Sequence, residues 1–253
     1  MEENNLQNQE TYQISTVEAV AGIFYDPANT FRAVLGSKKR NFWIIFIVIS
    51  IVLNLMSAFL FMNDAELVSE VKRLQRESVE KQINKSVEEG KLPKEKANEI
   101  IEQSEKNMEK FFAVSSYGFS FVGPIFLIFI PSLIYFLVFK ILKTQVDLMK
   151  IVNVVALAMV VFAVGSLLGT VLSIILGSLG GVSLGTVVSE ASVGRAGHLI
   201  LQKIDFFTLW YLFLITTGIK EAAGVTTAKS ASVVFGLWII WSIITIGGTL
   251  LFT

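Results

Sequence analysis

Residues 151–189 read IVNVVALAMVVFAVGSLLGTVLSIILGSLGGVSLGTVVS and contain no Asp, Glu, Lys, Arg or His. An α-helix rises about 1.5 Å per residue, and the hydrocarbon core of a bilayer is about 30 Å thick. The uncharged run is therefore long enough to cross a membrane. We predict a spanning helix over residues 151–176.

Small residues recur at every fourth position of this stretch. Small side chains let helix backbones approach closely, and in lipid such packing is a main source of helix association. The pattern therefore predicts that the other spans pack around this helix. The predicted helix-packing residues are Gly165, Gly169, Ser173, Gly177, Gly181 and Gly185. Glycines accumulate after Leu176, so we expect the helix to end there, with residues 177–197 forming either a re-entrant segment or an exposed loop.

The composition of the whole chain agrees with a membrane protein. Hydrophobic residues make up 53% of the 253 residues and charged residues only 17%, which is too apolar for an ordinary soluble domain. The formal net charge is zero, so nothing in the charge balance indicates a nucleic-acid partner. The chain has no cysteine, which excludes disulfides and thiolate metal sites.

Five apolar segments are candidates for crossing the bilayer. We therefore predict an all-α, polytopic membrane protein with five transmembrane helices and an inserted soluble helical hairpin. The fourth segment is long enough only if its helix begins near Leu199. The predicted spans cover about residues 42–62, 117–139, 151–176, 199–219 and 231–252 of a membrane domain that extends over residues 42–253.

The predicted hairpin covers residues 63–112, where the composition changes to densely charged. Residues 63–110 contain ten basic and twelve acidic residues, so this insertion lies in water. Gly90 and Pro93 separate two stretches with helical spacing of apolar residues. Opposite charges four residues apart should support the two helices. These pairs are Glu77 with Lys81 and Glu102 with Lys106.

Residues 14–41 are predicted to form two short amphipathic helices on the cytoplasmic side. Ser15 and Glu18 have the spacing of a capping box, while Asp26 can cap a second helix whose first turn accepts Pro27. The apolar faces of these helices either lie in the lipid headgroup layer or pack against the membrane bundle.

Basic residues set the expected orientation. Lys38, Lys39 and Arg40 precede the first span, and such clusters stay in the cytoplasm. Residues 1–13 are then a disordered cytoplasmic tail. Five crossings place the hairpin and the C-terminus on the extracytoplasmic side.

We find no group of residues with the spacing of a catalytic or metal site, and we expect no enzyme activity and no cofactor. His198 is the only histidine, and we expect it in a polar loop or at an interface and not in catalysis. Asp205 is predicted to cap a helix or anchor it at the interface, with a proton-relay role as the alternative. Asn54 and Asn153 are expected to form hydrogen bonds between spans.

The chain resembles the Ypt-interacting protein family, the Yip domain membrane proteins, in its bacterial branch. The resemblance is carried by short motifs before the first span and at the fourth and fifth spans. The residues are Phe24, Asp26, Pro27 and Phe31, then Asp205, Phe206, Phe207, Trp210, Gly218 and Ile219, and finally Lys229, Ala231 and Trp238.

The resemblance implies a non-catalytic five-helix bundle with a cytoplasmic N-terminus that associates with other membrane proteins. Eukaryotic members look like partners of Rab-type GTPases, but their Asp-Leu-Tyr-Gly-Pro segment is absent here, so a GTPase partner is not expected. The expected location is the cytoplasmic membrane if the source is bacterial.

We therefore predict a scaffold or partner-binding protein in membrane organisation. Its expected partners are the lipid bilayer and either other membrane proteins or further copies of the same chain. The alternative is a small-solute or ion transporter subunit that uses Asp205, the glycine-rich break and a second span kinked at Pro124 and Pro131.

Overall fold

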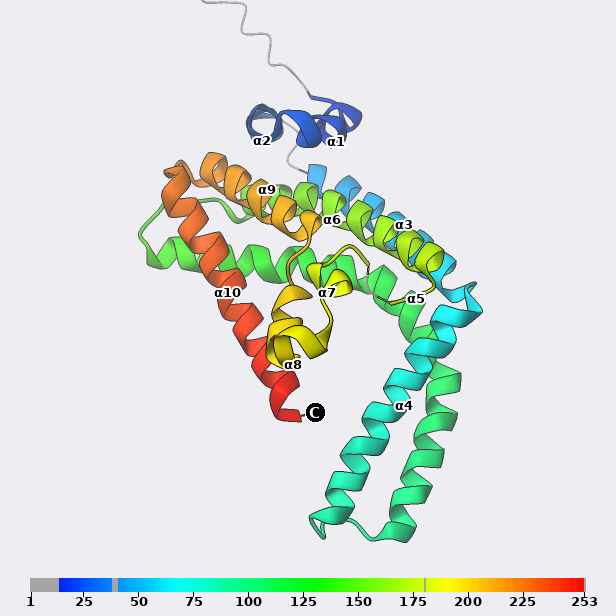
Figure 1. Ribbon diagram of the computed structural model, residues 1–253. Helices are drawn as coiled ribbons and strands as arrows, with labels where there is room; N and C mark the ends of the chain where they lie inside the picture. The colour runs from blue at the N-terminus through cyan, green and yellow to red at the C-terminus, as the bar shows by residue number, and fades with distance from the viewer. Residues whose placement is uncertain (1–13, 38–40, 180, 253) are drawn as a thin grey trace, which may run out of the picture. The chain divides into compact units, whose positions relative to one another are not determined.

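The computed structural model describes residues 14–37, 41–179 and 181–252, without the side chains of residues 109, 110 and 252. These residues form helices and no strand, apart from one isolated bridge between Ser183 and Asp205, so the all-α prediction is confirmed (Figure 1). The predicted tail over residues 1–13 and the basic cluster over residues 38–40 lie outside the described residues. The helices are α1 (Thr16–Tyr25), α2 (Pro27–Gly36), α3 (Phe42–Met62), α4 (Ala65–Glu88), α5 (Lys94–Ile141), α6 (Leu148–Leu176), α7 (Leu184–Val187), α8 (Glu190–Leu201), α9 (Phe206–Ala223) and α10 (Thr227–Phe252).

Within the described residues, four helical segments are long and apolar enough to cross a membrane. They support an integral membrane protein. The segments are Phe42–Met62 of α3, Phe111–Ile141 of α5, Leu148–Leu176 of α6 and Thr227–Leu251 of α10.

The expected start of a helix near Leu199 is wrong. Helix α8 ends at Leu201 and α9 begins at Phe206, because Asp205 accepts a hydrogen bond from the Thr208 amide and caps a new helix. Helix α9 has 18 residues, equivalent to about 27 Å. A fifth crossing by α9 stays a prediction.

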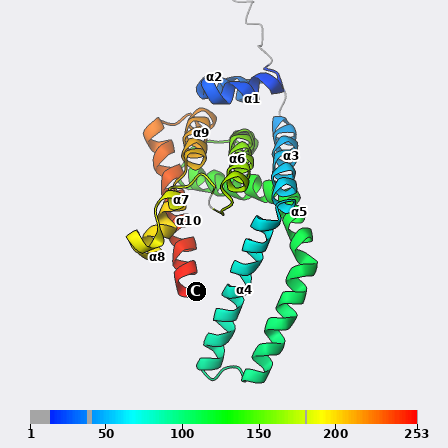
Figure 2. The same ribbon diagram turned by 45° about the vertical axis from the view of Figure 1, so that its right-hand side comes forward.

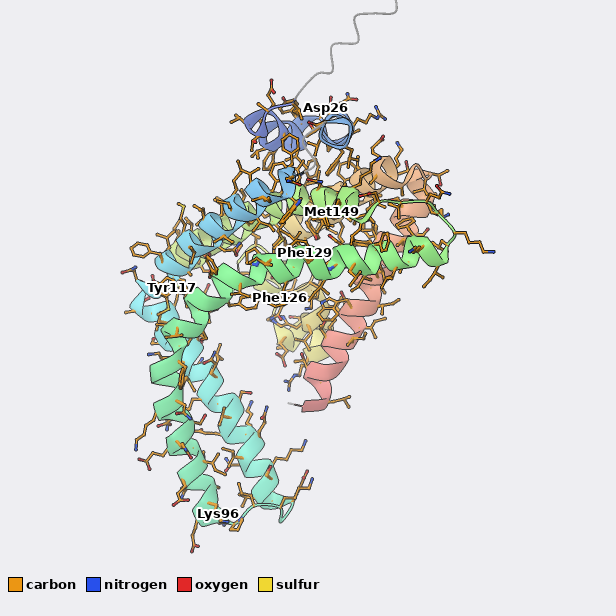
Figure 3. The ribbon with its side chains drawn as sticks, turned by 180° about the vertical axis from the view of Figure 1, so that it is seen from behind. Asp26, Lys96, Tyr117, Phe126, Phe129 and Met149 are labelled. Atoms are coloured by element: carbon orange, nitrogen blue, oxygen red, sulfur yellow. The ribbon has the colours of Figure 1, made fainter. Side chains whose placement is uncertain are left out.

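The predicted hairpin is present, but its second helix is not separate from the second span. Helix α4 ends before a turn at Gly90, where φ is 71°, and α5 then runs without interruption for 48 residues. Lys96 lies at the turn end of the hairpin (Figure 3). Pro124 and Pro131 both lie inside α5, so the span from about residue 117 to 139 is the second part of one long helix.

An ion pair joins the two hairpin helices to each other, and further ion pairs lie within each helix. The Arg76 guanidinium lies 2.9 Å from the Glu105 carboxylate on the facing helix, and Lys106 pairs with Glu102 as predicted. Glu77 pairs with Arg73 and not with Lys81. A carboxylate between two cations on one helix can turn to either. Arg73 binds Glu70 through Nε and Nη2, and its remaining Nη1 reaches Glu77.

The chain forms two compact units. The first, unit 1, contains the described parts of residues 1–50, 124–162 and 209–237, and the second, unit 2, contains those of 51–123, 163–208 and 238–253. In unit 1, α6 lies between α3 and α9 (Figure 2). The Asn153 side chain of α6 accepts a hydrogen bond from the Trp43 amide of α3 at 2.9 Å. Asn153 therefore joins two spans, as predicted.

In unit 2, the helix ends after Leu176 as predicted, so the small residues that recur at every fourth position do not lie along one helix. Gly165, Gly169 and Ser173 lie on α6, but the helix ends at Leu176. Gly177 and Gly181 have φ of 59° and 56°, a conformation that suits glycine and turns the chain.

The turned chain then folds back along α6. A Cβ built on Gly169 would lie 3.8 Å from the Gly181 Cα, and the Ser173 hydroxyl accepts a hydrogen bond from the Gly181 amide at 3.4 Å. Gly185 lies in α7, where a Cβ would come within 2.6 Å of the Gln202 side chain. The small residues thus pack against a returning segment of the same chain.

Gly165 lets Phe207 pack against the α6 backbone. A Cβ at Gly165 would lie 2.6 Å from the Phe207 Cβ and 2.9 Å from its Cδ1. Because such overlap forces the surroundings to shift, Gly165→Ala should lower the free energy of unfolding by about 1–3 kcal/mol. Thermal unfolding in detergent measures the effect.

The matched control is Gly236→Ala on α10, where a Cβ would meet nothing within 4 Å. This variant should melt at or above the wild-type temperature, because alanine favours a helix over glycine. Equal melting temperatures for Gly165→Ala and Gly236→Ala would contradict the close packing of Phe207 on Gly165.

Candidate functional site

Local capping builds the two N-terminal helices, and both are confirmed where the sequence predicted them. The Ser15 hydroxyl accepts from the Glu18 amide, and the Glu18 carboxylate accepts from the Ser15 amide, which completes a capping box. Asp26 lies between the helices (Figure 3) and caps α2, which begins at Pro27.

Helix α2 is docked on α9 and α6 within unit 1. Phe31 is fully buried, and a Cβ built on Gly218 would lie 3.0 Å from the edge of its ring. The same Cβ would overlap Val154 of α6. Only a glycine at this position leaves room for the phenylalanine ring. One face of the N-terminal helices therefore packs against the bundle, which is one of the two alternatives left open by the sequence.

An ion pair joins α2 to α9 at the edge of the same contact. Both ends of the Arg32 guanidinium reach the Glu221 carboxylate, with Nε to Oε2 at 2.9 Å and Nη2 to Oε1 at 3.1 Å. The Glu221 side chain is 15% exposed. The hydrogen bond from Arg32 is the main cause that lowers the pKa of Glu221.

The opposite face of α1 is apolar and open. Val17 is 78% exposed, Tyr25 is 77% exposed and Phe24 is 43% exposed. We call these three residues the α1 outer face. An apolar surface of this kind on a docked helix pair is typical of a contact surface for a protein or a lipid headgroup layer.

The structure brings together only some of the residues that carry the family resemblance. Asp26 and Pro27 start the helix that places Phe31 on Gly218, whereas Phe24 faces outward.

Asp205 and His198 both have structural partners in unit 2. The two oxygens of Asp205 accept hydrogen bonds from the amide and the hydroxyl of Thr208. His198 Nδ1 lies 3.0 Å from the Val188 carbonyl oxygen. The position of Asp205 agrees with the capping role expected from the sequence. His198 lies within α8, so the expected loop position is wrong.

The remaining resemblance residues lie on α9 and α10. Phe206 is 66% exposed at the start of α9. The Trp210 ring packs against the Phe213 ring at a tilt of 32°, with ring centroids 5.2 Å apart. Trp238 borders an apolar groove in unit 2. The described residues contain no group of acidic and histidine side chains that could hold a metal ion.

Sequence reasoning missed the Arg32–Glu221 ion pair. In the sequence, Glu221 is simply one of the charged residues that bracket a short turn after the fourth predicted span, with Lys220 and Lys229. An arginine in an otherwise apolar short helix was the available signal, since such a charge usually finds a partner. Nothing in the sequence indicated which of the 21 acidic residues that partner would be.

The comparisons with known proteins identify the family. A family model described as the Yip1 domain matches residues 21–248. The chain belongs to the Yip1 domain family. No curated protein and no solved structure matches it. The Yip1 domain match begins within α1 and ends within α10, so it includes Phe31, Gly218 and the ion pair between Arg32 and Glu221.

The ion pair should make the stability of this Yip1 domain protein depend on pH. Because the folded pKa of Glu221 lies below its ordinary value of 4.5, the pair stabilises the fold above that pH. The stabilisation is lost as the pH falls through the lowered pKa. Glu221→Gln should therefore melt a few degrees below wild type at pH 7, with a difference that shrinks below pH 4.5.

Melting curves in detergent between pH 7 and 3.5 measure this difference. Glu99→Gln is the control, since Glu99 is exposed on the hairpin part of α5. A wild-type minus Glu221→Gln difference that stays constant over this range would contradict the pH dependence.

Proposed function

We propose that this Yip1 domain protein is a non-enzymatic membrane scaffold that binds other membrane proteins, or a second copy of itself, through the α1 outer face. The observation that carries the proposal is the docking of α2. Phe31 and Arg32 hold the helix pair on one side, while Val17 and Tyr25 face outward on the other.

The docking of α2 on α9 and α6 makes the α1 outer face suitable for binding a partner. A surface held in place by a buried aromatic ring and an ion pair loses little conformational freedom on binding, which favours affinity. Aromatic side chains such as Tyr25 are also enriched among the residues that dominate binding energy.

The proposed orientation places α1 and α2 in the cytoplasm and the C-terminal end of α10 outside. Lys140, Lys143 and Lys150 surround the connection between α5 and α6, and positive charges of this kind favour the cytoplasmic side. The orientation requires that α9 crosses the membrane.

Single cysteines test this orientation, because the natural chain has none. Lys96→Cys at the hairpin turn should react with a membrane-impermeant maleimide added to intact cells. Ala228→Cys at the start of α10 should react only after the membrane is permeabilised. Labelling of both positions from outside would show that α9 does not cross, and the reverse pattern would overturn the orientation.

The scaffold role is tested by crosslinking and affinity capture from native membranes. Val17→Ser combined with Tyr25→Ser should reduce the recovery of crosslinked partners at least severalfold, because both side chains are removed from the contact. Ile100→Ser is the control, an exposed apolar residue on the hairpin part of α5 whose loss should leave recovery unchanged. Equal recovery with both variants would refute the α1 outer face as the binding surface.

The transporter alternative has less support. A proton relay needs a carboxylate that exchanges its partners, and both oxygens of Asp205 accept hydrogen bonds from Thr208.

A further inference from the structure

Unit 2 contains an apolar groove on the second half of α10. Helix α8 lies beside this half of α10 in both Figures 1 and 2. The groove has a volume of about 460 Å³, which is in the range of ligand sites. Its walls are Ile200 and Ile204 on one side and Ile243, Ile246 and Leu250 of α10 on the other.

The α10 wall of the groove belongs to a segment that is long and apolar enough to cross a membrane, so lipid can reach the groove from this side. It extends along α10 from Trp238 to Leu250, which is about 18 Å of helix. Gly247 lines the groove, and a Cβ built there would meet nothing within 4 Å. The absence of a side chain at Gly247 therefore keeps space in the groove open.

Two polar side chains at the groove have no partner among the described residues. Lys203 is the one charged residue that lines the groove, and none of the ion pairs within the described part of the chain includes it. The Ser242 hydroxyl is buried without a hydrogen-bond partner among the described residues. The nearby carboxylate of Asp205 is held by Thr208.

We propose that this groove binds an anionic phospholipid. An acyl chain lies along the isoleucines of α10, the ammonium of Lys203 pairs with the headgroup phosphate, and the Ser242 hydroxyl donates to an oxygen of the lipid. The aliphatic walls match the chain, and the single unpaired cation matches the charge of the headgroup.

The charge at the groove favours a lipid over an apolar helix from a second chain. Lys203 is the one charged residue among the described residues that line the groove. An apolar partner helix would cover its ammonium without supplying an anion, whereas a phospholipid supplies both an acyl chain and a phosphate.

The full-length protein tests this proposal in detergent with added phosphatidylglycerol or phosphatidylcholine of identical chains. Native mass spectrometry measures retained lipid, and thermal unfolding measures stabilisation. Phosphatidylglycerol should be retained in preference to phosphatidylcholine. Lys203→Gln should reduce this preference roughly fivefold, the equivalent of about 1 kcal/mol for one cation near an anionic lipid.

A matched pair of variants tests the groove itself. Gly247→Leu fills the groove and should abolish retention of both lipids, whereas Gly248→Leu on the adjoining position, also open, should retain them as wild type does. A cooperative thermal unfolding transition without added lipid shows that a variant is folded. If Gly247→Leu does not fold, Lys203→Gln still tests the proposal independently.

Three results would overturn the proposal. The first is equal retention of the two lipids by the wild-type protein. The second is stabilisation by free glycerol phosphate equal to that by phosphatidylglycerol, which would indicate an anion site without a lipid chain. The third is a change in oligomeric state with Gly247→Leu while lipid retention is unchanged, which would assign the groove to a second copy.

Discussion

In each of the two units of this Yip1 domain protein, a phenylalanine ring packs directly on a glycine backbone and holds that unit together. Phe31 lies on Gly218 in unit 1, and Phe207 lies on Gly165 in unit 2. Lipid offers little hydrophobic gain for helix association, so close contact and dispersion must supply much of the stability. A glycine under an aromatic ring allows the ring to approach the helix backbone most closely. Each ring also places its own segment against a helix that is distant in the sequence.

Several polar groups within the apolar helices form hydrogen bonds inside the protein, because lipid offers them no partner. Asn153 accepts from the Trp43 amide, and the hydroxyls of Ser57 and Thr170 lie 2.6 Å apart. The Ser230 hydroxyl of α10 donates to the Thr216 carbonyl of α9 at 2.7 Å. Each of these hydrogen bonds joins two helices. It therefore satisfies a polar group and also fixes the position of one helix against the other.

The two proposed surfaces use different parts of the chain and different chemistry. The α1 outer face belongs to unit 1 and offers apolar side chains on a docked helix pair. The groove on α10 belongs to unit 2 and combines aliphatic walls with the ammonium of Lys203. Protein binding and lipid binding would then be separable by mutation, as expected for a membrane scaffold that also depends on its lipid environment.

Features encoded within four or five neighbouring residues were predictable from the sequence. The capping box at Ser15 and the cap at Asp26 were identified correctly, because a helix cap depends on residues three positions apart. Apolar runs likewise identified α3, α6 and most of α10. The hairpin was recognised from its charge, although its continuity with the second span was not.

By itself, then, the amino-acid sequence determined the helical class, the membrane location, the central apolar helix and the charged hairpin. Only the tertiary structure decided that the small-residue ladder turns back after Leu176, that Phe31 lies on Gly218 and that Arg32 pairs with Glu221. The physical reason is the range of the interactions. Hydropathy and caps act between neighbours, whereas these contacts join residues that only the packing of distant segments brings together.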